Sequence, residues 1–199
     1  MIFLTGFFFI VIGYLFGSVN SAIVVCKIMG LPSPRSIGSG NPGATNVLRL
    51  GNKKAAALTL LGDALKGFIP VCMAHYFHLF PDMVCWVAFA AVLGHAYPIF
   101  FGFKGGKGVA TGLGVMLGIN PVLGLLVLVT WLVIAFAFRY SSLAAIVAVV
   151  LMPIYGYFLL AKDWSSTSVL VLIAVFVLIR HKDNIQRLVS GKESKIGKK

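Results

Sequence analysis

Long uninterrupted apolar segments are the feature that most constrains how this chain can fold. A helix needs about 20 mainly apolar residues to cross roughly 30 Å of hydrocarbon. Six runs of this kind occur, at residues 3–26, 54–77, 83–101, 121–138, 141–161 and 164–180. Hydrophobic residues make up 59% of the 199 residues and charged residues only 11%, whereas a soluble domain carries about 25% charged residues. The sequence therefore predicts one all-α domain, residues 1–199, embedded in a membrane.

A shorter apolar segment at about residues 108–118 leaves two topologies open. At 1.5 Å per residue it reaches only about half of the hydrocarbon thickness. It is either the first part of a kinked helix over 109–138 or a short helix of its own, since Asn120 and Pro121 favour a turn. One kinked helix divides the 17 basic residues into 9 and 8, whereas two helices place 16 on one side and leave Lys162 alone on the other.

The second arrangement is preferred because short loops rich in Lys and Arg stay in the cytoplasm. It predicts seven transmembrane helices, one of them short, with the N-terminus external and a basic tail at about 190–199 in the cytoplasm. The first apolar run carries no basic residue before Lys27. It therefore lacks the charged start of a secretory signal peptide, and we expect it to be retained as the first helix.

The loop between the first two long spans has the composition of a phosphate-binding site. Residues 36–49 read SIGSGNPGATNVLR, in which three glycines free the backbone to approach a ligand closely. Thr45 or Asn46 can cap a short helix that places Arg49 about one turn later. Free backbone N–H groups, a helix start and an arginine together bind phosphate. This combination favours a binding site over a loop that only covers helix ends.

A second glycine-rich loop on the same side carries two lysines. Residues 101–111 read FGFKGGKGVAT, with Lys104 and Lys107 beside the glycines. The loop is not a Walker motif, because the Gly-x4-Gly-Lys-Ser/Thr order is absent. Anionic lipid headgroups and a bound phosphate ester are equally suited partners for these lysines. Three glycines that follow are candidates for helix packing, namely Gly112, Gly114 and Gly118.

A third polar motif, RHKDNIQRL over residues 180–188, follows the last span, which is expected to continue into the cytoplasm as a helix. His181 and Asn184 are three residues apart and would share a face of that helix. They offer a titratable imidazole and an uncharged amide donor. A basic anchor at the membrane surface is the simpler interpretation of Arg180, Lys182 and Arg187.

Other polar residues point inward from the membrane. Asp63 and Lys66 can pair on one helix face, and both a functional role and a neutralising structural pair remain open because charges within a span are costly. His95 is expected to be hydrogen-bonded inside the bundle. Ser142, with its neighbour Ser141, can cap a helix or bind a phosphate. The sequence shows no metal-ligand spacing of Cys and His residues.

Together the three motifs resemble those of the bacterial acyl-phosphate:glycerol-3-phosphate acyltransferases, small integral membrane enzymes of phospholipid synthesis. The resemblance rests on residues 38–49, 102–111 and 181–188, with Gly191 and Glu193. It implies seven spans in the bacterial cytoplasmic (inner) membrane and an active site on the cytoplasmic face. It also implies transfer of an acyl group from acyl phosphate to the 1-hydroxyl of glycerol 3-phosphate, giving lysophosphatidic acid and phosphate.

The resemblance further implies roles for the motif residues. The phosphate of the acyl donor is assigned to the first loop, at Ser39, Gly40, Asn41 and Gly43, and Asn46 is counted among the substrate-binding residues. Glycerol 3-phosphate is assigned to Arg49, Lys104, Ser142 and His181. Lys107 can hold either phosphate, and Asn184 is the candidate donor to the oxyanion that forms on the acyl carbonyl. The general base is either His181 or the leaving phosphate itself.

Other function classes fit the sequence less well. A transporter for organic phosphates would want a repeat between halves and a basic site on the external face, and the sequence predicts neither. A phosphatidyltransferase needs a multi-aspartate metal motif, whereas the chain has five acidic residues in all. So little polar surface argues against nucleic-acid binding. The expected partners are the two substrates and membrane lipids, with no cofactor, no metal and no obligatory protein partner.

Overall fold

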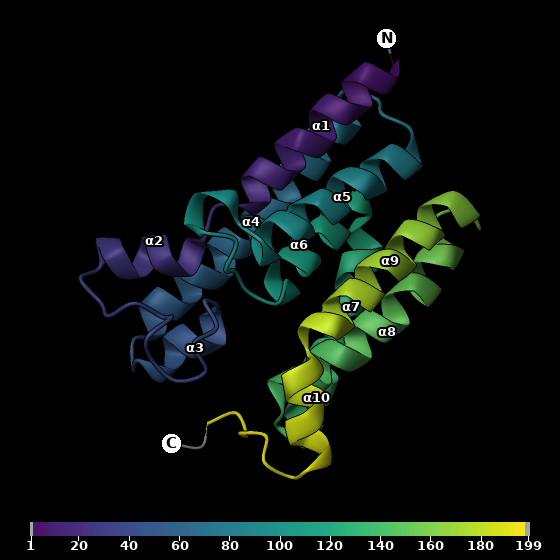
Figure 1. The fold of residues 1–199 in the computed structure, drawn as a ribbon. Coiled ribbons are helices and arrows are strands. Elements are labelled where there is room, and N and C mark those ends of the chain that lie inside the picture. The colour runs from purple at the N-terminus through teal and green to yellow at the C-terminus, as the bar shows by residue number, and fades with distance from the viewer. Residues whose placement is uncertain (1, 198–199) are drawn as a thin grey trace.

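A computed structural model describes residues 2–197, which fold into helices joined by short loops (Figure 1). The helices are α1 (Ile2–Gly17), α2 (Ser21–Ile28), α3 (Ala44–Arg49), α4 (Lys53–Tyr76), α5 (Pro81–Ala96), the 3-10 turn η1 (Ile99–Phe101), α6 (Val109–Ile119), α7 (Pro121–Phe138), α8 (Ser141–Leu159), α9 (Trp164–Arg180) and α10 (Lys182–Val189). The start of α1 lies at one end of the molecule, whereas α2, α3, α10 and the segment after α10 gather at the other end (Figure 1). The all-helical fold predicted from the sequence is confirmed for these residues.

The predicted spans correspond to helices, with two breaks that were not predicted. The helical segments 53–76, 81–101, 121–138 and 141–159 are each long and apolar enough to cross a membrane. The pair α1 and α2 bends by 41° and the pair α9 and α10 by 61°, and each pair reaches that length only when it is counted as one broken span. Within the described residues this gives four to six candidate spans, and α6 is a shorter apolar helix.

The break between α1 and α2 corrects the prediction of one continuous helix over 3–26. Ser18 Oγ donates to the Tyr14 carbonyl oxygen at 2.8 Å, and the side chain of Asn20 accepts from the Ile23 N–H at the start of α2. The Val19 carbonyl oxygen, between them, accepts from Lys66 Nζ at 2.6 Å. The helix therefore ends where polar partners replace its own hydrogen bonds, one of them from a distant segment.

The predicted turn before α7 is confirmed. Asn120 has an extended backbone, and its side chain accepts from the N–H groups of Val122 and Leu123, while Pro121 occupies the first position of α7. A side-chain cap followed by proline is a strong helix start. The segment 109–138 is therefore two helices and not one kinked helix.

Glycines bring neighbouring helices into close contact. A Cβ atom on Gly17 would overlap the Ala91 carbonyl group of α5, and one on Gly114 would overlap the Ala64 carbonyl group of α4. Gly118 faces Val71 in the same way, whereas Gly112 has open space around it. Two of the three α6 glycines therefore have the predicted packing role, because only small residues let helix backbones approach this closely.

The outer surface of the bundle is apolar. On α7, Leu125, Val133 and Phe136 are exposed, and Phe136 retains 85% of its accessible surface. A soluble monomer rarely exposes an apolar face of this extent. This face is the part of the bundle suited to contact lipid chains.

The predicted pair of Asp63 and Lys66 forms within the bundle. Lys66 Nζ lies 2.8 Å from Asp63 Oδ1, and both side chains are almost completely buried. His95 is also buried, but its Nδ1 lies 3.7 Å from the same carboxylate oxygen, beyond the range of the hydrogen bond expected for it. Because Lys66 also holds the Val19 carbonyl, the pair ties α4 to the break between α1 and α2.

We expect Lys66→Met to destabilise the protein by about 3–5 kcal/mol, because it leaves the Asp63 carboxylate buried without its close cationic partner. The double variant Asp63→Leu/Lys66→Met removes both charges and should recover most of this loss. Thermal unfolding in detergent measures the difference. Equal melting temperatures for the single and double variants would contradict the interpretation.

Candidate active site

The first glycine-rich loop is folded around one buried side chain. Asn46 Oδ1 accepts from the Ser39 N–H at 3.0 Å, while Asn46 Nδ2 donates to the carbonyl oxygens of Pro34 and Ile37 at 2.7 and 2.9 Å. Gly38 has a positive φ of 62°, and a Cβ atom there would overlap Asn46 Oδ1. Asn46 therefore shapes the loop, since its hydrogen bonds go to the loop backbone.

The predicted cap of the next helix is wrong. Helix α3 begins after Gly43, which makes no side-chain cap, and Thr45 and Asn46 lie inside the helix. The predicted short helix itself is present and places Arg49 in its last turn. The Arg49 side chain reaches the segment after α10 and donates from Nη2 to Ser194 Oγ at 2.6 Å.

The second glycine-rich loop packs against the end of α5. The N–H groups of Gly105 and Gly106 donate to the carbonyl oxygens of Ala96 and His95, both at 3.1 Å. A Cβ atom on Gly105 would overlap the His95 carbonyl oxygen, and one on Gly106 would overlap the His95 ring. These two glycines are therefore required by close packing on α5, and their N–H groups are engaged by protein carbonyls.

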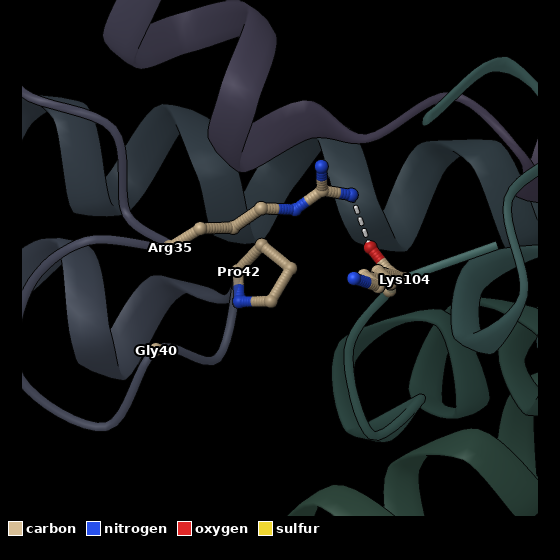
Figure 2. Close-up of a pocket in the computed structure, with 5 residues that line it drawn as sticks. Arg35, Gly40, Pro42 and Lys104 are labelled. Atoms are coloured by element: carbon tan, nitrogen blue, oxygen red, sulfur yellow. Dashed lines mark hydrogen bonds between the residues drawn. The ribbon is translucent and has the colours of Figure 1, made fainter. Parts of the chain in front are cut away.

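The two glycine-rich loops meet at a cavity of about 350 Å³. Arg35, Gly40 and Pro42 line it from the first loop and Lys104 and Gly105 from the second (Figure 2). Lys104 was predicted to bind substrate, and the structure brings it to Gly40 of the predicted donor site. Arg35 was not predicted, because nothing in its local sequence marks it apart from the other basic residues of the loops.

The third motif bends at His181 and does not continue α9 as predicted. His181 is the residue between α9 and α10, and only 2% of its surface is exposed. Its Nδ1 lies 2.8 Å from the Val177 carbonyl oxygen. Because a carbonyl can only accept, Nδ1 carries the proton, and Nε2 is the acceptor of the neutral ring.

Asn184 joins the second loop to the segment after α10. Its Oδ1 accepts from Lys107 Nζ at 2.5 Å, and its Nδ2 donates to Glu193 Oε1 at 2.6 Å. The predicted proximity of Lys107 and Asn184 to one site is therefore present. Burial, followed by the nearby positive charge of Arg187, lowers the pKa of Lys107 below its usual value.

Glu193 is the acceptor on which this part of the site converges. Ser142 Oγ donates to Oε1 at 2.6 Å and Arg187 Nε donates to Oε2 at 2.7 Å, in addition to the bond from Asn184. Burial alone would raise the pKa of Glu193, but these three donors and the Arg187 charge hold it below its usual value. The third sequence motif includes Glu193 but indicates no role for it, although it is the only acidic residue after Asp183.

The serines at the start of α8 do not cap it. The residue before the helix is Tyr140, which makes no side-chain cap, and Ser142 lies in the first turn with its hydroxyl on Glu193. Arg187, interpreted from the sequence as a membrane anchor, is likewise engaged by Glu193. The capping alternative for the two serines is therefore wrong, whereas the substrate contact of Ser142 stays a prediction.

The assembled site is suited to anions. Arg49 belongs to the first loop and donates to Ser194, whereas Lys104 and Lys107 belong to the second loop. Asn184 accepts from Lys107 and donates to the Glu193 carboxylate. In the part of the chain that the structure describes, no three His, Cys, Asp or Glu residues are placed to hold a metal ion. An excess of cations beside amide and hydroxyl groups is the arrangement that binds phosphate esters.

Comparisons with known proteins identify the family. The family described as glycerol-3-phosphate acyltransferase matches residues 7–191. Relatives named glycerol-3-phosphate acyltransferase include one from Burkholderia cenocepacia, 56% identical over 94% of this chain and 89% of the relative. Another, from Thiobacillus denitrificans, is 54% identical over 96% of each chain.

A solved structure supports the same grouping. The crystal structure of PlsY, described as an integral membrane glycerol 3-phosphate acyltransferase in its glycerol 3-phosphate form, matches with a TM-score of 0.91 and 39% identity. The match covers 97% of this chain and 96% of that one. The lysophosphatidic acid form of PlsY matches with a TM-score of 0.89. The chain therefore belongs to the PlsY-type family of integral membrane glycerol-3-phosphate acyltransferases.

Proposed function

We propose that this protein transfers an acyl group from acyl phosphate to the 1-hydroxyl of glycerol 3-phosphate, giving lysophosphatidic acid and inorganic phosphate. The observation that carries the proposal is the meeting of two cation-bearing loops at one cavity, beside a third group of polar donors. Both substrates are phosphate esters or anhydrides, so a site with two cationic regions suits them. Membership of the family supports glycerol 3-phosphate as the acceptor.

The donor phosphate is assigned to the first loop and the acceptor phosphate to the cations around it. Ser39, Gly40, Asn41 and Gly43 hold the phosphate of the acyl donor, and Arg49, Lys104, Ser142 and His181 hold glycerol 3-phosphate. Lys104 lines the cavity that Gly40 also lines, which supports an arrangement in which the two phosphates bind close together. Such proximity is what a direct transfer between two bound substrates requires.

The reaction proceeds by attack of the 1-hydroxyl oxygen on the acyl carbonyl carbon. The carbon–oxygen bond to phosphate breaks, phosphate leaves, and the hydroxyl proton passes to the leaving phosphate or to Nε2 of His181. Asn184 donates from Nδ2 to the oxyanion, a donor type worth about 3 kcal/mol in the transition state. Lys107 holds the other side of the Asn184 amide and fixes its orientation.

The proposed membrane arrangement has seven helices, with α6 as the short one. Helix α1 with α2 contributes one broken span, α9 contributes another up to its bend into α10, and four longer helical segments contribute the other long spans. The N-terminus is external, and the three motifs face the cytoplasm. This orientation follows from the 16 basic residues on one side against Lys162 on the other, and it suits the bacterial inner membrane.

An assay with purified protein tests the proposed function. Acyl phosphate and labelled glycerol 3-phosphate are expected to give labelled lysophosphatidic acid in the absence of acyl-CoA and acyl carrier protein. Parallel reactions with acyl-CoA or acyl carrier protein as the only acyl source should give no product. Failure to form product from acyl phosphate would exclude the proposed donor, and product from acyl-CoA alone would replace it.

We expect Arg49→Ala and Lys104→Ala to raise the KM for glycerol 3-phosphate by about 10- to 100-fold, the equivalent of one hydrogen bond to a charged group. Steady-state kinetics with each substrate varied in turn measures the change. Lys54→Gln is the control, because it removes an exposed positive charge from the start of α4, outside the three motifs. An unchanged KM in the two site variants would remove both residues from the acceptor site.

His181→Ala distinguishes the two candidate bases. If the leaving phosphate takes the proton, we expect kcat to fall by only a few-fold and the KM for glycerol 3-phosphate to rise. Loss of an obligatory general base would instead lower kcat by about 100- to 10,000-fold. We favour proton transfer to the leaving phosphate, so the smaller effect is the expected result, and kcat measured at saturating substrate decides.

A further inference from the structure

Two arginines without an assigned role bind the backbone of the second glycine-rich loop. Arg35 donates from Nη2 to the Phe101 carbonyl oxygen at 2.8 Å and also to the Lys104 carbonyl oxygen (Figure 2). Arg180 donates from Nε and Nη2 to the Gly106 carbonyl oxygen at 3.4 and 3.2 Å. The two guanidinium groups therefore hold the two halves of the loop.

Neither arginine forms an ion pair with an acidic side chain among residues 2–197. Among residues 2–197 the ion pairs join Lys66 and His95 to Asp63, and Arg187 to Glu193. Arg180 instead lies over the Tyr97 ring, with its guanidinium carbon 5.2 Å from the ring centre. A guanidinium has five N–H donors in a fixed planar fork, which suits it to grip backbone carbonyls and to stack on a ring.

The two contacts come from different parts of the fold. Arg35 belongs to the first loop, and its grip on the Lys104 carbonyl holds that residue at the cavity shared with Gly40. Arg180 is the last residue of α9 and donates to the carbonyl oxygen of Gly106. Gly106 directly precedes Lys107, whose ammonium group donates to Asn184. Each arginine therefore holds the loop backbone at or beside a different lysine.

On the basis of the proposed function, we propose that Arg35 and Arg180 are positioning residues for the reaction, Arg35 for Lys104 and Arg180 for Lys107. Neither needs to touch a substrate, because each acts through a backbone carbonyl of the loop. A displacement of about 1 Å in a reacting assembly can cost 100-fold in rate. Loss of the Arg35 contact should therefore displace Lys104 more than Lys107, and loss of the Arg180 contact should displace Lys107 more than Lys104.

Double-mutant cycles test this pairing. We expect Arg35→Gln and Arg180→Gln each to lower kcat/KM by up to about 100-fold. In a Lys104→Ala background, Arg35→Gln should add only a few-fold, whereas Arg180→Gln should keep its full effect. In a Lys107→Ala background, Arg180→Gln should add only a few-fold and Arg35→Gln should keep its full effect. The reason is that coupling appears only between groups that act together.

Conservative variants and a charge control separate positioning from charge. Arg35→Lys and Arg180→Lys keep the positive charge but lose the planar fork, so we expect them to recover only part of the activity. Lys54→Gln removes a positive charge at an exposed position and should leave kcat/KM unchanged. Full recovery by both lysine variants would assign the arginines to the general electrostatic field and overturn the proposal.

A binding measurement keeps this test independent of the proposed function. Calorimetric titration with glycerol 3-phosphate repeats the Arg35 and Lys104 cycle without turnover, and hydrogen exchange of the Gly105 and Gly106 amides reports loop position for both arginines. We expect weaker, coupled binding and faster exchange in the variants. The inference would be overturned if the effects multiplied equally in both lysine backgrounds, or if hydrogen exchange of the two glycine amides were unchanged. Absence of product from the wild-type protein would overturn the proposed acyl donor alone.

Discussion

Replacing Gly105 with alanine is expected to lower kcat/KM by about 100-fold or more. The added Cβ atom would overlap the His95 carbonyl oxygen, Pro98 and the Ala96 carbonyl oxygen. Backbone atoms cannot rotate aside as a side chain does, so the loop must move away from α5. A shift of about 1 Å at Lys104 is enough for an effect of this size, and steady-state kinetics measures it.

Gly112 supplies the matched control for this prediction. It lies in α6 with no atom near the position of a new Cβ, and alanine is favoured over glycine in a helix by about 1 kcal/mol. We therefore expect Gly112→Ala to keep full activity and an equal or higher melting temperature. Normal kinetics in Gly105→Ala, with the Gly112 variant also normal, would show that the loop tolerates displacement from α5.

Replacing Asn184 with alanine is the second change with a large expected effect. We expect kcat to fall by about 100- to 1,000-fold, as for the loss of an oxyanion donor. One N–H of the Asn184 amide is engaged by Glu193, and the second N–H is the proposed donor to the acyl oxygen. The measurement is kcat at saturating acyl phosphate and glycerol 3-phosphate.

Asn52 is the control for an asparagine that only stabilises the fold. Its side chain accepts from the Ala55 N–H at 2.9 Å at the start of α4, and loss of such a cap costs about 1 kcal/mol. Asn52→Ala should therefore lower the melting temperature slightly and leave kcat unchanged. If Asn184→Ala retained kcat within a few-fold, Asn184 would be a structural partner of Glu193 and Lys107 and no part of the reaction.

The sequence predicts the helices well because hydropathy is a local property. The four long spans and the turn at Asn120 follow from runs of apolar residues and from one capping pattern. The break at Ser18–Asn20 could not be predicted in this way, because the group that occupies the Val19 carbonyl is Lys66, in another helix. The bend at His181 could not be predicted either, since no proline or glycine marks it.

For a related reason, the sequence predicts some residues of the candidate site and misses others. Arg49, Lys104 and Asn184 could be named because their side chains carry the chemistry that a phosphate site needs. The scaffolding functions of Arg35 and Glu193 could not, because their partners are 66 and 51 residues away, at Phe101 and Ser142. Asn46 was assigned to substrate by its type, whereas its hydrogen bonds shape the loop.

The lengths of the helices relate the site to the thickness of its bilayer. Helices α7, α8 and α9 have 18, 19 and 17 residues, which is about 25–29 Å at 1.5 Å per residue. This is slightly less than the roughly 30 Å hydrocarbon layer of an average membrane. A helix shorter than the hydrocarbon layer can be accommodated by local thinning of the lipids around it. On the proposed function, such thinning would draw the headgroup layer toward the glycine-rich loops. The anionic acyl donor would then meet the cations at the level where its phosphate lies.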